Sequence, residues 1–417
     1  RSSDLANVVA PVGGDRLMNP RLPANAANTQ QLVLPKAAQA ALRNATTSVN
    51  HVVLLAMHSW TSSHHVISQW DAASGTATVK PASLWSFLRF GSDQRFALEN
   101  LPEFLDAPGE WWASQEGELR YFLRDGEVAS TLTAEIPQIE RLLALTGTTQ
   151  KPVRFVQFKG LRFAYASSLV APYVDSQAAT GVPAAVIVQQ ARDISFTQCI
   201  FENLGGHALW LSKGSHNVAI DHNVFRKLGA GAIRIGETAF SLDEDARTGE
   251  NLIEDNLIED TGLLFPGAVA LWVGQSANNH LLHNQIQRTS YTGISVGWTW
   301  GFGGSAARNN LIEGNWLRQI GQGKLSDLGG IYTLGISPGT VIRGNRIEDV
   351  KSFRKTDASA WGIYLDEGSS QILVEQNYVN GATGAAFHLH YGNDDVVQNN
   401  VFNAGGNTGT SGTDFGI

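Results

Sequence analysis

The hydrophobic and polar positions of this chain follow a pattern that repeats from about residue 200 to residue 405. Short runs of alternating apolar and variable residues each begin at a glycine, in the segments GHALWL, GAIRI, GAVALWV, GISVGW, GIYTLG, GIYLDEG and GAAFHLH. Alternation with a period of two is typical of a strand with one buried face. No helical periodicity competes between residues 185 and 405. The pattern therefore predicts strands only.

An asparagine follows each of these runs after a second apolar segment, in frames such as HNVF, DNLI and GNRI. It recurs at Asn223, Asn256, Asn284, Asn315, Asn345, Asn377 and Asn400, with spacings of 33, 28, 31, 30, 32 and 23 residues. A period that varies but never breaks indicates stacked supersecondary units. Because no helix separates the strands, we predict an all-β parallel β-helix, or solenoid.

The asparagine column has a structural interpretation rather than a functional one. Asparagine tolerates left-handed φ, and its amide can bond to the equivalent group one coil away, so we expect one such residue in a tight turn of every coil. Cys199, in the frame QCIF, stands 24 residues before Asn223 and opens the series one coil early. As the only cysteine it forms no internal disulfide, and we expect it to be a small buried residue.

Two domains are expected. Residues 1–148 predict a β-rich accessory module, inserted in or packed on the first coils, and residues 149–417 predict the solenoid that carries the active-site cleft. In the module, VVLLAMHSW and HHVISQW read as strands separated by a Thr-Ser-Ser turn. TGTTQKP is the expected joint between the domains. The C-terminal AGGNTGTSGTDFGI lacks a capping pattern, so we expect truncation there or a partner that covers the end.

Composition narrows the function. The 417 residues carry a formal net charge of −8 without a basic run, which argues against nucleic-acid binding and favours a neutral polymer over a strongly anionic one. No apolar run is long enough to span a membrane. The chain begins at Arg1 rather than methionine, which is consistent with the removal of a leader. Long β-solenoids are usually extracytoplasmic, which predicts a secreted or periplasmic protein. The oligomeric state is not determined by the sequence.

Aligning the coils on their apolar positions predicts which side chains point outward. Pairs such as Ile363 and Leu365 fill the interior, and the residue between them is expected to face solvent. That first outward column contains Trp210, Arg234, Trp272, Ser295, Tyr332 and Tyr364. An aromatic column of this kind suits a saccharide cleft. Alternatively, the N-terminal module or long loops cover an apolar strip. The next outward column is mostly small and contains Ser212, Gly236, Gly274, Gly297, Leu334 and Asp366.

Two acids are the candidate catalytic residues. Asp366 is the carboxylate of the second column, and Asp327 in GQGKLSDLGGIY precedes the strand of the neighbouring coil. Glycosidic hydrolysis requires two carboxyl groups that flank one bond. Asp366 could instead be a solvated acid at a strand end. Glu367, displaced by one position, is expected to face differently, and we assign it to substrate binding.

Other side chains are candidates for substrate binding. Trp298 and Trp300 share a face if their strand continues, as do His388 and His390 one coil beyond Asp366. The two histidines are expected to bond sugar hydroxyls, although core packing or a metal remain alternatives, and no third metal ligand is apparent. We expect neither a metal nor another cofactor. The remaining assignments to substrate binding are Trp272, Tyr332, Tyr364, Arg234, His58 and Trp60.

Five motifs together resemble glycoside hydrolase family 141, whose members are right-handed parallel β-helix proteins. They are LSDLGGIYTLGISPGTVIRGNRI, WGIYLDEGSSQILVEQNYV, AAFHLHYGNDDVVQNNVF, YTGISVGWTWG and NLPEFLDAPGEWW. The resemblance covers residues 50 to 405 and implies α-L-fucosidase-like action on pectin or xylanase-like action. It places the family's acid pair on Asp327 and Asp366. The sequence departs from the family at Asn393 and Asp394, where a basic residue often follows the glycine, which suggests an altered cleft.

Three functions are consistent with these patterns. The first is a glycoside hydrolase that acts on a plant or microbial polysaccharide. The second is a polysaccharide lyase that acts on uronic-acid polymers, with Arg234 as its base. The third is a non-catalytic carbohydrate-binding protein that uses the aromatic column alone. The sequence does not determine the sugar, the linkage, exo or endo action, or retention or inversion.

Overall fold

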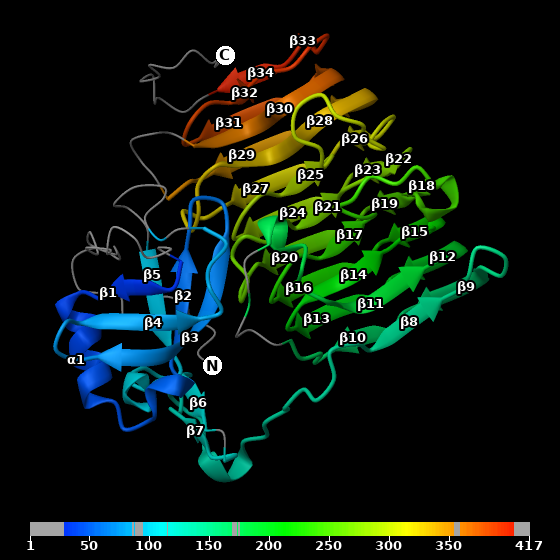
Figure 1. Cartoon of the computed structure of the whole chain (residues 1–417). Helices are drawn as coiled ribbons and strands as arrows, with labels where there is room; N and C mark the ends of the chain where they lie inside the picture. Colours follow the sequence, from blue (N-terminus) through cyan, green and yellow to red (C-terminus); the bar gives the residue numbers. More distant parts are fainter. Residues whose placement is uncertain are drawn as a thin grey trace. The chain divides into compact units, whose positions relative to one another are not determined.

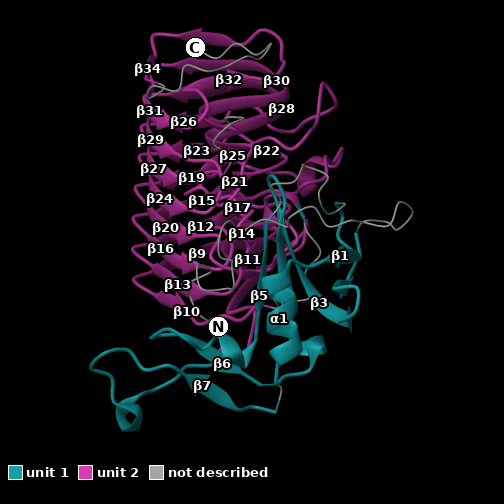
Figure 2. Cartoon of the chain, turned by 90° about the vertical axis from the view of Figure 1, so that its left-hand side faces the viewer, with its two compact units in different colours: residues 1–136, 169–176 teal, residues 137–168, 177–417 magenta. Residues whose placement is uncertain are grey.

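The computed structural model of the chain describes residues 29–85, 87, 95–114, 116–168, 173, 176–353 and 359–403. The chain divides into two compact units (Figure 2). Unit 1 comprises residues 1–136 and 169–176, and unit 2 comprises residues 137–168 and 177–417. The C-terminal segment for which we expected no cap, residues 404–417, lies outside the described residues.

Unit 1 is built on a five-stranded antiparallel sheet of order β1-β4-β3-β2-β5. Its strands are β1 (Gln31–Val33), β2 (Val53–Met57), β3 (Ser62–Asp71), β4 (Thr76–Lys80) and β5 (Arg95–Glu99). A smaller sheet pairs β6 (Trp111–Ala113) with β7 (Leu119–Tyr121). The two predicted strands of the module are confirmed, because β2 and β3 form an antiparallel pair.

Helix α1 (Lys36–Asn44) closes the core of unit 1. Its sequence is rich in alanine and leucine, which favour helix, and Pro35 stands immediately before it. Ala38 and Leu42, four residues apart, share the buried face and join a core that includes Leu54, Ile67 and Phe96.

Unit 2 is a parallel β-helix, as the repeat predicts (Figure 1). Each coil contributes strands to three faces, and every strand pair between successive coils is parallel. The first face contains β8 (Leu143–Thr146), β11 (Ala184–Gln189), β14 (His207–Leu211), β17 (Ile233–Ile235), β21 (Leu271–Val273), β25 (Ile294–Val296), β28 (Leu328–Arg343), β30 (Ala360–Glu375) and β32 (Phe387–Leu389).

Strands of the second face follow those of the first in each coil. They are β9 (Val153–Lys159), β12 (Ala191–Thr197), β15 (His216–Asp221), β19 (Leu252–Glu254), β23 (His280–Leu282), β26 (Leu311–Glu313), the C-terminal halves of β28 and β30, and β33 (Val396–Gln398). The third face is a nine-stranded sheet of β10 (Arg162–Ala164), β13 (Ile200–Leu204), β16 (Val224–Leu228), β20 (Leu257–Thr261), β24 (Gln285–Thr289), β27 (Trp316–Ile320), β29 (Arg346–Val350), β31 (Tyr378–Ala382) and β34 (Val401–Asn403).

The boundary between the domains differs from the prediction of 148/149. Strand β8 pairs in parallel with β11, so the solenoid begins before the expected joint. The segment TGTTQKP is instead the turn between β8 and β9, closed by hydrogen bonds between the backbones of Thr148 and Lys151. Residues 169–176 then return to unit 1. This short segment carries no repeat signal, which is why the sequence did not predict its place in unit 1.

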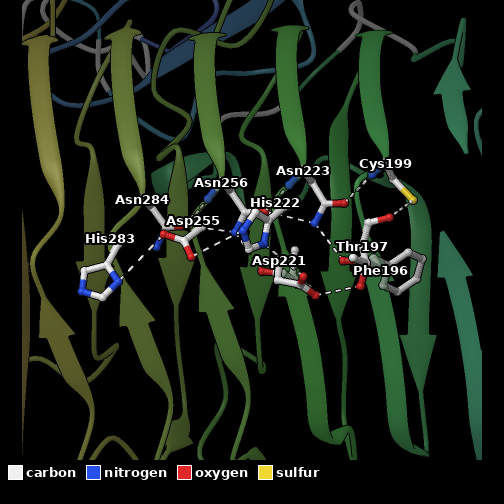
Figure 3. Close-up of polar contacts among 11 residues, drawn as sticks. Phe196, Thr197, Cys199, Asp221, His222, Asn223, Asp255, Asn256, His283 and Asn284 are labelled. Carbon is white, nitrogen blue, oxygen red and sulfur yellow. Dashed lines mark hydrogen bonds and ion pairs between the residues drawn. The ribbon is translucent and has the colours of Figure 1, made fainter. Parts of the chain in front are cut away.

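The recurring asparagines form a ladder at the corner between the second and third faces (Figure 3). Each amide Nδ2 donates to the Oδ1 of the asparagine in the next coil, at 3.0 Å from Asn223 to Asn256 and 2.9 Å from Asn256 to Asn284. The ladder continues to Asn400, and its first rung is the backbone N–H of Cys199, which donates to Asn223. Cys199 is buried and unpaired, as predicted.

The prediction for the turn itself was wrong in one respect. The left-handed residue is the one before each asparagine, not the asparagine. These residues are His222 (φ 54°), Asp255 (52°), His283 (51°), Gly314 (65°), Gly344 (64°), Gln376 (58°) and Asn399 (55°). The asparagine is thereby left free to turn its amide inward, where it satisfies buried backbone groups. A second ladder, which the sequence analysis missed, joins Asn251, Asn279 and Asn310.

Candidate active site

The first outward column has the predicted register. Trp210 pairs with Arg234, Arg234 with Trp272, and the column continues through Ser295, Tyr332 and Tyr364 to His388. The interior columns on either side are buried as expected, with Ile363 and Leu365 fully inaccessible. The prediction that the column faces solvent is wrong, because five of the six predicted members, all except Trp210, are less than 9% exposed.

Segments of unit 2 itself cover part of this column. The Arg234 guanidinium lies 4.1 Å from the ring centre of Trp210 and 5.3 Å from that of Trp272, and it donates a 2.7 Å hydrogen bond to the Thr180 carbonyl. Trp272 is fully buried and packs edge-on against Trp298, with 5.2 Å between ring centroids. Arg234 and Trp272 are therefore part of the packing of the first face, and neither offers a surface to a polymer.

Asp366 lies on β30 and receives three hydrogen bonds. Tyr332 donates to its Oδ2 at 2.7 Å, Tyr364 donates to its Oδ1 at 2.8 Å, and Nδ1 of His390 lies 2.9 Å from the same Oδ1. The arrangement follows from the register, because Tyr332 and Tyr364 are paired on adjacent coils and His390 extends the column of Asp366 by one coil. The carboxylate side chain is 15% exposed and that of His390 is 44% exposed.

Both tyrosines remain protonated donors. Burial raises the pKa of Tyr332 well above its ordinary value, and the negative charges of Asp366 and Asp327 raise it further. The pKa of Tyr364 is raised for the same reasons, burial first and then the two aspartates. Their O–H groups thus donate to Asp366, and both oxygens of its carboxylate act as acceptors, which is the pattern of the ionised form.

Asp327 precedes β28, the strand that pairs with β30, so the two acids lie on neighbouring coils as predicted. A third buried phenol, Tyr291, donates to the backbone carbonyl of Asp327. Burial raises the pKa of Tyr291, and the charges of Asp327 and Asp366 add to the effect. The charges of both aspartates thus raise the pKa of the same three phenols, Tyr291, Tyr332 and Tyr364.

The two predicted histidines differ in environment. His388 is buried and stacks on Trp361, with ring centroids 4.3 Å apart and an interplanar angle of 10°. His390 is half-exposed and contacts Asp366 directly. Only His390 is thus placed to reach a ligand beside the carboxylate, whereas His388 supports the aromatic wall formed by Trp361 and Tyr364.

The tryptophan pair and Glu367 lie at the edge of the site. Trp298 is nearly buried, whereas Trp300 is 47% exposed and lies edge-on to it at 5.4 Å. The Oε2 of Glu367 accepts a 3.3 Å hydrogen bond from Tyr391. The Glu367 carbonyl also accepts the backbone N–H of Gly301, which ties the Trp300 loop to β30.

The predicted ligand contacts of the N-terminal module belong to unit 1. His58 is buried and bonds through Nε2 to the hydroxyl of Ser63 at 2.9 Å. Burial lowers the pKa of His58 to about 3, and the charge of His65 contributes to the shift. Trp60 packs edge-on against Trp85 at 5.4 Å. His58 is therefore a neutral core group of unit 1.

Sequence reasoning missed three side chains of this site: Tyr291, Trp361 and Tyr391. Tyr291 and Tyr391 stand outside the strands, and Trp361 opens β30 before the glycine used for alignment, so the repeat gave no signal for them. Within the described part of the chain, no group of three or more His, Cys, Asp or Glu side chains is arranged to hold a metal ion. The described residues also include no helix long and apolar enough to cross a membrane.

Comparison with known proteins supports the fold. Residues 246–415 match the family model described as Right handed beta helix region. A solved structure described as Glycoside hydrolase is similar to the chain with a TM-score of 0.76 and 20% sequence identity, over 97% of this chain and 76% of that one. The predicted right-handed parallel β-helix is thereby confirmed.

Other solved structures are more distant. The surface protein and adhesin PfbA of Streptococcus pneumoniae gives a TM-score of 0.42 with 14% identity, over 60% of this chain and 74% of that one. DFA-IIIase from Arthrobacter chlorophenolicus A6 gives 0.36 with 18% identity, over 63% and 69%. At these scores neither adds to the argument. No curated protein matches the chain.

Proposed function

We propose that the chain is a glycoside hydrolase that cleaves a plant or microbial polysaccharide at Asp366. The observation that carries this proposal is the set of three hydrogen-bond donors on the Asp366 carboxylate, beside a second acid on the next coil. The resemblance of the motifs around Asp327 and Asp366 to glycoside hydrolase family 141 supports the same pair. An α-L-fucosidase-like or xylanase-like activity follows from that resemblance, together with a secreted or periplasmic location.

We assign the two acids different roles. Asp366, whose carboxylate oxygens both accept hydrogen bonds, is the base or nucleophile. Asp327 then protonates the leaving oxygen, as the reaction requires of one carboxyl group. The Tyr332 and Tyr364 phenols orient the carboxylate of Asp366 and hold it for attack. Substrate distortion and contacts with sugar hydroxyls, including those from His390, complete the site.

The lyase alternative is weaker. It depended on Arg234 as an outward base, and Arg234 is 3% exposed between two tryptophan rings. A purely binding protein is also less well supported, because a carboxylate held by two buried phenols is not required for stacking sugars. Burying a carboxylate costs free energy of desolvation. A catalytic role explains that cost, whereas a binding role does not.

The leaving group tests the assigned roles. The wild type, Asp366→Asn and Asp327→Asn are assayed on a panel of plant polysaccharides and on aryl glycosides with poor and good leaving groups, nitrophenyl and dinitrophenyl. Asp366→Asn is expected to lose about a hundredfold to ten-thousandfold of kcat on every substrate. Asp327→Asn is expected to lose a similar factor on the polysaccharide but to recover on the dinitrophenyl glycoside, which leaves without a proton.

Glu375→Gln is the matched control, since it changes another acid of the same strand, β30. Circular dichroism confirms that each variant is folded. Full activity in both Asp366→Asn and Asp327→Asn would overturn the site. An unsaturated product that absorbs ultraviolet light, formed by the wild type, would favour the lyase instead.

A further inference from the structure

Four exposed aromatic side chains of unit 2 lie in three loops that follow strands of the first face. They are named here the aromatic shelf, and they are Phe240 (40% exposed), Trp300 (47%), Phe302 (53%) and Tyr391 (40%). Large aromatic rings are usually buried in a folded protein, so a group of them on the surface indicates a ligand. The sequence alignment suggested only Trp300, because the other three lie in loops outside the repeat.

One end of the shelf is attached to the strand that carries Asp366. The Phe302 and Tyr391 rings meet edge-on, with centroids 5.9 Å apart. The hydroxyl of Tyr391 donates to Glu367, and the backbone of Gly301 donates to the carbonyl of the same residue. These bonds fix the loop containing Trp300 and Phe302 beside the carboxylate, so a chain bound at Asp366 continues onto the rings.

The other end of the shelf is Phe240. A Cβ added to Gly304 would lie 3.5 Å from Cε1 of Phe240, so the ring packs on the far side of the same loop. Two side-chain hydrogen bonds fix this loop. Gln275 donates to the Thr299 hydroxyl at 2.8 Å, and Thr299 donates to the Gly304 carbonyl at 3.2 Å. The exposed rings are therefore held by a loop with its own hydrogen bonds, which reduces the ordering cost of binding.

The length of the shelf suits a polymer. Phe240 follows β17 and Tyr391 follows β32, and the strands β17, β21, β25, β28, β30 and β32 are successive members of the first face. These strands span five spacings of ~4.8 Å, and the loop between β25 and β26 bridges them, because it lies against Phe240 at Gly304 and against Tyr391 at Phe302. Four large rings joined in this way offer contacts to more than one sugar residue.

The charges around the shelf select against an acidic polymer. Glu367 lies at one end, and at the other end Glu237 and Glu244 stand three residues before and four residues after Phe240 in the sequence. The guanidinium of Arg247 approaches the Phe240 ring at 5.5 Å, but it is paired with Glu244 at 3.4 Å. Asp366 and Asp327 add further negative charge to the site. A polyuronate would meet repulsion along this whole path.

We propose that the aromatic shelf binds an uncharged polysaccharide chain that runs along the solenoid axis and passes Asp366. The inference rests on the proposed function and narrows its substrate class to neutral glycans with several residues on one side of the cleaved bond. Sugar C–H faces stack on the exposed rings of Trp300, Phe302 and Tyr391, while Phe240 contacts the distal residues. A substrate too short to reach the shelf is still cleaved at Asp366.

Affinity electrophoresis of the full chain tests this surface. Asp366→Asn, which removes turnover, is run through gels that contain soluble arabinoxylan, xyloglucan, galactomannan or polygalacturonate. The expected result is retardation by at least one neutral glycan and none by polygalacturonate. Adding Trp300→Ala and Phe302→Ala to the same protein is expected to weaken that binding roughly tenfold or more. Tyr378→Ala is the control, because Tyr378 is an exposed ring on the third face. Adding it to Asp366→Asn is expected to leave polymer binding unchanged.

The outcomes distinguish a failure of the shelf proposal from a failure of the proposed function. Turnover that depends on Asp366, combined with unchanged polymer binding and kcat/KM in the Trp300→Ala and Phe302→Ala protein, would overturn the shelf and leave the proposed function standing. Retardation by polygalacturonate, or by no neutral glycan, would also overturn it. Shelf-dependent binding to a neutral glycan without any turnover by the wild type would support the shelf and contradict the hydrolase.

Discussion

Asp366 differs in its partners from acids of the third face that form ion pairs with arginine. Glu202 is paired with Arg226, and Asp260 is paired with Arg288. Asp366 is held instead by two neutral phenols and an imidazole. An arginine would cancel the charge of the carboxylate, whereas a phenol orients it and leaves that charge available to a developing positive centre.

Removing one phenolic hydroxyl tests this role at Tyr332. Tyr332→Phe deletes the donor to Oδ2 of Asp366 and keeps the ring. Hydrogen bonds to charged groups contribute about 1.5–3 kcal/mol, so kcat is expected to fall about tenfold to a hundredfold with little change in KM. Tyr378→Phe, which loses the hydroxyl of an exposed ring on the third face, is the control. Equal kinetics in the two variants would contradict the role of Tyr332.

Among the elements of the fold, the asparagine ladder is the one that keeps the coils in register. Each rung joins three coils. Asn284 donates to the Asn315 side chain and the Ile253 carbonyl, and it accepts both the backbone and the side-chain N–H of Asn256. All of these groups are buried, so an unmade bond is not replaced by water. The ladder thus satisfies the buried hydrogen-bonding groups at this corner of successive coils. It depends on a residue with left-handed φ immediately before each asparagine.

Truncation of one rung is expected to destabilise the stack. Asn284→Ala removes four buried hydrogen bonds and leaves the backbone N–H of Asn256 without an acceptor, at a cost of about 2–4 kcal/mol in the free energy of unfolding. Asn380→Ala is the matched control, because it removes a single bond to Asn403 on the surface of the third face and is expected to cost less than about 1 kcal/mol. Denaturant titration of both variants measures the difference, and similar midpoints would refute the ladder's contribution.

For the molecule as a whole, both units contain buried histidines that make stability fall in acid, and in unit 2 burial lowers the pKa of His207 to about 3. Unit 1 contains buried His58 and His65, and burial lowers the pKa of each. His58 takes up its proton near pH 3 when folded and near its ordinary value of 6.5 when unfolded. The unfolded state therefore binds more protons between these values. Stability is complete above about pH 6.5 and falls as the pH is lowered towards 3.

Replacing His58 is expected to remove part of that dependence. The melting temperature of His58→Gln, measured from pH 7 to pH 4, should fall less steeply than that of the wild type. His280→Gln, an exposed residue of unit 2, is the control and should follow the wild type. A slope for His58→Gln as steep as that of the wild type would show that this histidine does not govern the acid sensitivity.

How far the sequence predicts this molecule depends on whether a residue belongs to the repeat. The interior positions, the pairing of Tyr332 with Tyr364 and the neighbouring coils of Asp327 and Asp366 all follow from a strand period of two and a regular stack. The burial of Arg234 and Trp272 does not, because irregular segments that carry Thr180 and Trp298 cover them. The domain boundary and Tyr291 escaped prediction for the same reason.

The most direct test of the central claim, that Asp366 catalyses hydrolysis of a neutral glycan, is mass spectrometry of the products formed in water enriched in heavy oxygen. The wild type is predicted to release fragments of the glycan that retards it, each with one heavy oxygen at the new reducing end. Asp366→Asn, folded by circular dichroism, is predicted to release none. Unsaturated fragments without the label, or labelled fragments from Asp366→Asn at the wild-type rate, would contradict the account.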